Sequence, residues 1–181
     1  MKKFLMLFTI VAVFILQSNL CAAKNYVYVY PGSWNEFLDE LEKICAKNDI
    51  NFTGEESQSE VFFSVQFYHT NGFVEIAGSS HDIEKYIEKF AVTSYASFDD
   101  LSLTQFGKVL GATLFIIGLS DSEIDEFTFQ FKRSLYQMSS HAKKFKKKFS
   151  IYCKKAAMYI EINFTAENGG LAYSYIQAYR R

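Results

Sequence analysis

The sequence is poor in several residue types on which common folds and sites depend. Its 181 residues include one proline, one tryptophan, three histidines and three cysteines. One proline and no Ser/Gly-rich stretch leave no visible linker, and aromatic residues run from end to end, which argues against disorder. The net charge of −1 becomes −3 without Lys2 and Lys3, so global attraction to nucleic acid is not indicated.

The stock catalytic motifs are absent as well. The chain has no His-Glu-x-x-His, no phosphate-binding glycine loop, no Gly-x-Ser-x-Gly and no Cys-x-x-Cys. We expect His69 at a strand end, His81 in a first helical turn and His141 on the polar side of a helix. None of them lies three or four residues from another histidine. The sequence therefore names no catalytic residue, no metal ligand and no cofactor.

The first 23 residues are the most informative segment of the chain. Lys2 and Lys3 precede an apolar run over residues 4–16, and a Cys-Ala-Ala sequence follows a short polar stretch. This is the pattern of a secretory signal peptide that is cleaved before Lys24. We therefore expect a signal peptide at 1–23, a single globular domain at 24–181, and export to the periplasm or the medium.

Two anchored forms are the alternatives to cleavage. A spanning helix needs about 20 apolar residues, and polar residues interrupt the run at Gln17. A lipid on Cys21 favours leucine three residues before the cysteine and a small residue directly before it. Ser18 and Leu20 hold those places, so both anchored forms fit the residues less well than a cleaved one.

Two cysteines, Cys45 and Cys153, remain after cleavage. An even pair in an oxidising compartment can form a disulfide. The long loop between them would give about 4 to 5 kcal/mol of stability in the chain-entropy picture. The alternative is two buried thiols that behave as small hydrophobes.

Hydrophobic periodicity and turn residues predict the elements. The strands are expected at 25–30 and in two hairpins, which turn at Asn71-Gly72 and at Asn168-Gly169-Gly170. The helices are expected after Ser33, which opens a capping box with Glu36, over a stripe at 83–90, over 102–118, and over 120–149. Residues 113–117 could instead form a buried strand.

The two hairpins differ in how far the sequence determines their registers. In the first, a two-residue Asn-Gly loop pairs His69 with Val74 and Phe67 with Ile76, so that the apolar faces coincide. In the second, a two-residue loop would place Tyr173 and Tyr175 on the apolar face. A three-residue loop would turn these tyrosines outward.

These elements predict an α+β fold. Its antiparallel sheet is built from the first strand and two hairpins, with about four helices packed mainly on one face. Two local anomalies then offer candidate surfaces: a lysine cluster and two tyrosine-rich strands.

The lysine cluster includes Lys143, Lys144 and Lys147, interleaved with phenylalanines. It could contact an anionic membrane surface, an acidic polymer or an acidic protein. The alternative is an ordinary solvated face near a helix C-terminus, where cations are favoured by a few tenths to about 1 kcal/mol.

The tyrosines alternate along the first and last strands. Tyr26, Tyr28 and Tyr30 occupy one side of the first, and Tyr173 and Tyr175 occupy one side of the last. If both sides face outward on one sheet, they form an amphipathic aromatic surface of the kind used at protein interfaces. The alternative places them at the edges of the core.

Together these features predict an exported, non-catalytic domain that binds a protein partner in the envelope or outside the cell. The rival prediction is a hydrolase that acts on envelope polymer or carbohydrate, with carboxylates drawn from distant loops and a deep cleft. A third reading is peripheral contact of the lysine cluster with an anionic membrane, which high salt would abolish.

Overall fold

A computed structural model describes residues 25–48, 50, 56–59, 61–69, 72–96, 100–136, 144–167 and 171–180. The strands are β1 (Asn25–Val27), β2 (Glu56–Gln58), β3 (Phe62–His69), β4 (Gly72–Ser79), β5 (Lys89–Ala96), β6 (Lys144–Cys153), β7 (Met158–Glu167) and β8 (Leu171–Arg180). The helices are α2 (Trp34–Lys47), α3 (Asp100–Ile117) and α4 (Asp121–Tyr136).

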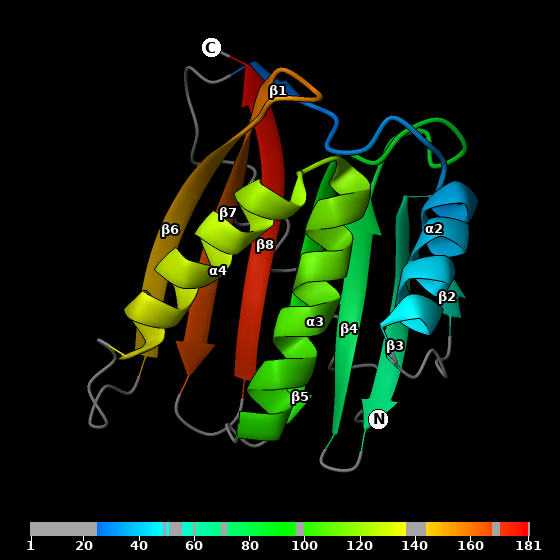
Figure 1. Cartoon of the computed structure of the whole chain (residues 1–181). Helices are drawn as coiled ribbons and strands as arrows, with labels where there is room; N and C mark the ends of the chain where they lie inside the picture. The colour runs from blue at the N-terminus through cyan, green and yellow to red at the C-terminus, as the bar shows by residue number, and fades with distance from the viewer. Residues whose placement is uncertain are drawn as a thin grey trace.

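The eight strands form one antiparallel sheet in the order β2-β3-β4-β5-β8-β7-β6, and β1 pairs with the end of β8. All three described helices lie on one face of this sheet (Figure 1). One half of the sheet is the four-stranded meander β2–β5, which follows α2 in the chain. The other half is the three-stranded meander β6–β8, which follows α3 and α4, and the halves join where β5 pairs with β8. The predicted α+β class is confirmed, whereas the described residues hold three helices instead of four and a larger sheet.

Helix α2 begins where the sequence predicts. The Ser33 side chain accepts from the backbone N–H of Glu36, and the Glu36 carboxylate accepts from the Ser33 N–H, which makes a complete capping box. The apolar side of the helix buries Trp34 and Phe37, and the Trp34 ring stacks on Phe63 of β3 at 4.2 Å between centroids. Aromatic packing therefore fixes α2 to its half of the sheet.

A glycine on β4 makes this packing possible. A Cβ atom at Gly78 would lie 2.0 Å from Cε2 of Phe63. The Phe63 ring thus rests directly on the backbone of its neighbouring strand, between Gly78 and Trp34. The close approach explains why this strand position carries no side chain.

Helix α3 lies over the middle of the sheet, close to β4 and β5, and α4 lies over β6 (Figure 1). Phe106 and Phe131 contact Phe164 of β7 at centroid distances of 6.0 and 4.7 Å, and Phe127 meets Phe149 edge to face at 5.2 Å. The region 113–117, left between helix and strand by its periodicity, is the last part of α3.

The first hairpin keeps the predicted faces but not the predicted pairs. Val65 pairs with Ile76 and Phe67 with Val74, and the last pair joins His69 to Gly72. The register thus differs by two residues from the prediction. Side chains alternate with a period of two, so this shift leaves every apolar residue on the same face.

The second hairpin adopts the longer of the two predicted loops. Glu167 pairs with Leu171, Phe164 with Ser174, and Ile162 with Ile176. Tyr173 and Tyr175 therefore point away from α3 and α4, on the second face of the sheet, which is the face opposite the three helices.

The helix predicted from a stripe at 83–90 is wrong. Ile87 forms an isolated bridge with Tyr30, and β5 begins at Lys89. Phe90 is buried in the core and contacts Phe37 at 4.6 Å, but it does so from a strand. Tertiary pairing with β4 and β8 outweighs the local helical spacing.

The helix predicted over 120–149 is correct only to Tyr136. Residues 144–153 form edge strand β6 instead. Phe145 and Phe149 are four residues apart, and four is an even number, so the same spacing that suits one side of a helix also suits one face of a strand. Lys144, Lys146 and Lys148 recur with period two on the opposite face of β6, which is the strand signal that the helical prediction overlooked.

Candidate functional site

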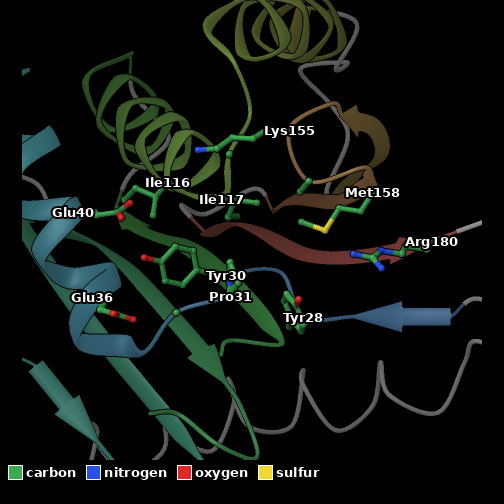
Figure 2. Close-up of a pocket in the computed structure, with 13 residues that line it drawn as sticks. Tyr28, Tyr30, Pro31, Glu36, Glu40, Ile116, Ile117, Lys155, Met158 and Arg180 are labelled. Atoms are coloured by element: carbon green, nitrogen blue, oxygen red, sulfur yellow. The ribbon is translucent and has the colours of Figure 1, made fainter. Parts of the chain in front are cut away.

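Two pockets meet at the end of the sheet where β1, the β6–β7 turn and the start of α2 come together. The α2 pocket has a volume of about 530 Å³. Figure 2 shows residues of α2, the end of α3 and the end of β8 around it. Its lining consists of Tyr28, Tyr30, Pro31, Gly32, Glu36, Glu40, Ile116, Ile117, Gly118, Lys155, Ala156, Met158 and Arg180.

The second pocket, named the β1 pocket, has a volume of about 510 Å³. Its lining consists of Tyr26, Val27, Tyr28, Tyr86, Glu88, Lys89, Gln177 and Arg180. Tyr28 and Arg180 line both pockets and therefore form the wall between them. Tyr28 is 45% exposed, and its ring lies 6.0 Å from that of Tyr86.

Tyr30 supplies a buried hydroxyl to the α2 pocket. Its ring meets Phe37 edge to face at 5.7 Å, and only 7% of the residue is exposed. Burial, together with the nearby carboxylates of Glu40 and Glu36, raises the pKa of Tyr30 to about 12. The hydroxyl thus stays protonated at neutral pH and donates to Glu40. Figure 2 shows it directed toward α2.

The other carboxylates at the two pockets also accept from groups of the protein itself. Glu36 accepts from the backbone N–H of Ser33 at 2.8 Å and from its hydroxyl at 3.2 Å. In the β1 pocket, Glu88 lies 2.9 Å from Nδ1 of the exposed His81. His81 was expected in a helix, and its role here is to hold a carboxylate from a loop before β5.

The cations of the pockets have no such partner. Within the described part of the chain, Lys89, Lys155 and Arg180 form no ion pair with a carboxylate. The stem of Lys155 lies near Gly118, where an added Cβ would be 3.5 Å from its Cδ. Gly118 has φ +111°, so it both ends α3 and leaves room for this stem.

The predicted tyrosine surface is divided by the fold. Tyr26 and Tyr28 are 36% and 45% exposed at the pockets, whereas Tyr30 turns into the helix layer because β1 ends at Val27. Tyr173 is half-buried and Tyr175 only 2% exposed on the second face. The five residues therefore do not make one outward surface.

The second face carries an aromatic row that sequence reasoning missed. The rings of Tyr179 and Tyr159 stack at 5.3 Å, and Tyr159 contacts Tyr152 at 5.1 Å. These residues come from β8, β7 and β6, and Tyr26 of β1 pairs with Tyr179. Only the cross-strand register reveals the row, because its members are far apart in sequence.

Two carboxylates are buried on the same face. Glu161 is 1% exposed, accepts from Nε2 of Gln177 at 2.8 Å, and pairs with Lys148 at 2.7 Å. Glu75 is 3% exposed and accepts from Gln66, with no ion pair to a described cation. Burial raises the pKa of Glu75, while hydrogen bonds from neighbouring side chains oppose that rise.

The lysine cluster lies on edge strand β6 and not on a helix. Lys144 pairs with Glu167 across to β7, and Lys147 is exposed on the face that carries the helices. Lys143 lies outside the described residues, as does His141. Lysines along an edge strand discourage pairing with another chain, so the row has a structural role that the helical reading did not include.

The two cysteines are separate buried thiols in the structure, so the predicted disulfide is not present. Cys45 lies on α2, and burial raises its pKa to about 11. The thiol of Cys153, at the end of β6, donates to the carbonyl of Gly118 at 3.4 Å.

The described residues contain no group of three or more His, Cys, Asp and Glu side chains placed to hold a metal. No helix within the described ranges has the length and hydropathy to cross a membrane. Comparisons with protein-family models, curated proteins and solved structures find no match to the chain. Any function must therefore be argued from the geometry of the site.

Proposed function

We propose that this protein is an exported, non-catalytic binding domain that engages a protein partner through the α2 and β1 pockets. The observation that carries the proposal is the wall shared by the two pockets, made of an exposed tyrosine and an arginine, Tyr28 and Arg180. Tyrosine and arginine are enriched among the residues that dominate binding energy at protein interfaces. Export rests on the signal-peptide pattern of residues 1–23.

Two neighbouring pockets suit a chain segment better than a compact metabolite. A small ligand is usually buried by one cavity. Here Tyr28 stands between two cavities of similar volume, about 530 and 510 Å³. A partner segment that passes over Tyr28 can place side chains in both, so the ring would be covered on both sides.

The rival prediction is a hydrolase. The α2 pocket does contain two carboxylates, but both of them already accept hydrogen bonds from the protein. Glu36 is held by the capping box of α2, and Glu40 accepts from the Tyr30 hydroxyl. A general acid or base needs to exchange a proton with a substrate. Polymer hydrolysis that the wild type performs and Glu40→Gln abolishes would nevertheless overturn the binding proposal.

The test uses the protein expressed from residues 1–181 as bait for chemical crosslinking in envelope and medium fractions, with mass spectrometry of the captured proteins. Tyr28→Ala should reduce capture of a stoichiometric partner about tenfold or more. Tyr152→Ala is the matched control, because Tyr152 is 46% exposed but lines neither pocket. Equal losses in both variants, or no captured protein, would refute the proposal.

A further inference from the structure

We infer that the partner segment entering the α2 and β1 pockets is an acidic peptide segment. This inference rests on the proposed function and specifies the chemistry of its ligand. The formal charges that line the two pockets balance. Three are carboxylates and three are cations: Glu36, Glu40, Glu88, Lys89, Lys155 and Arg180. Whether the pockets prefer an acidic or a basic ligand therefore depends on which of these charged groups already have hydrogen-bond partners in the protein.

The three carboxylates are engaged by donors of the fold. Glu36 accepts hydrogen bonds from the Ser33 N–H and hydroxyl, and Glu40 accepts one from the Tyr30 hydroxyl. Glu88 accepts one from His81. A cationic ligand would have to compete with these hydrogen bonds. Carboxylates of both pockets accept hydrogen bonds from the protein, so the pattern does not depend on the placement of one side chain.

The three cations retain their hydrogen-bonding capacity. None of them has a described carboxylate within ion-pair distance, and Arg180 lines both pockets. Its guanidinium offers a planar set of donors that matches a carboxylate. Figure 2 shows Lys155 and Arg180 on different sides of the α2 pocket. Successive acidic side chains along one segment can therefore meet different cations.

The apolar lining favours a peptide over an inorganic polyanion. Ile116, Ile117 and Met158 are buried core residues that also line the α2 pocket, and Tyr28 projects between the pockets. These groups can cover the aliphatic carbons of glutamate and the backbone of a peptide. A bare polyphosphate has no apolar part to place there.

The first measurement is fluorescence anisotropy of labelled hexaglutamate with the protein expressed from residues 1–181. Hexaglutamine, hexalysine and a short polyphosphate serve as comparison probes. Hexaglutamate should bind most tightly, and Arg180→Gln should weaken it about tenfold, because hydrogen bonds to charged groups are the stronger ones. Lys155→Gln should weaken it about threefold.

Lys147→Gln is the matched control, because this lysine is exposed on the helix-bearing side of the sheet but lines neither pocket. Its effect on hexaglutamate binding should stay below about twofold. Equal losses in all three lysine and arginine variants, or tighter binding of hexalysine or polyphosphate, would overturn the inference. A partner that depends on Tyr28 while hexaglutamate does not bind would overturn the inference alone and leave the proposed function standing.

Discussion

Replacing Gly78 by alanine should destabilise the protein although the change adds a single methyl group. The new Cβ would lie 2.0 Å from Cε2 and 2.5 Å from Cζ of Phe63. Phe63 is fully buried and stacks on Trp34, which is 1% exposed, so the ring has no free space to enter. Overpacking of this kind costs about 2 to 3 kcal/mol. The midpoint of thermal unfolding should fall by roughly 5 to 10 °C for a domain of this size.

Circular dichroism during heating and urea titration would measure the loss. Gly107→Ala is the matched control, because Gly107 lies in α3 with no atom within 4 Å of its added Cβ. It should stabilise the protein by about 0.5 to 1 kcal/mol through helix propensity. The double variant Gly78→Ala with Phe63→Leu should recover part of the loss. A change below about 0.5 kcal/mol for Gly78→Ala alone would refute the packing of Phe63 against β4.

Three further predictions concern buried charged and thiol groups. Lys148→Gln should cost about 1 to 3 kcal/mol in urea unfolding because it removes the ion pair that Lys148 forms with buried Glu161. Lys144→Gln should cost less than about 1 kcal/mol because both groups of its pair are exposed. Equal losses would contradict this. The raised pKa of Glu75 means that its contribution to stability is complete below the ordinary carboxyl pKa and is lost as pH rises through the raised value. Glu75→Gln should therefore flatten the fall in unfolding free energy from acid toward neutral pH, and parallel pH profiles would refute this. Cys45, with a pKa of about 11, should react with a thiol reagent slowly in the folded protein and rapidly in urea, and fast reaction in both would contradict its burial.

Local sequence signals predicted the features that neighbouring residues determine, such as where a helix begins and which face of a strand is apolar. The capping box at Ser33 begins α2, and the helix predicted over 102–118 matches α3, which spans Asp100–Ile117. Faces of the first hairpin were predicted correctly even though its register was shifted by two, because the apolar pattern constrains the face but not the pairing partner. The helix predicted at residues 145–149 was wrong because a spacing of four residues fits one side of a helix and one face of a strand equally well.

The candidate site could be predicted only in part. Tyr26 and Tyr28 were named from the alternation of the first strand, but no local signal places Arg180 or Lys155 beside them. They reach the pockets because β1 pairs with β8 and because the β6–β7 turn lies beside the end of α3. These contacts join segments that are distant along the chain, and the sequence of either segment contains no trace of the other.

The position of β8 determines when the sheet can be completed. This strand lies between β5 and β7 and also pairs with β1, yet it follows every other described strand in chain order. During synthesis the β2–β5 meander and the β6–β7 hairpin can form separately, but they stay unjoined until Leu171–Arg180 has emerged. Pairings between such distant segments form slowly. A chain with this topology therefore closes its sheet only after its last described strand has been made.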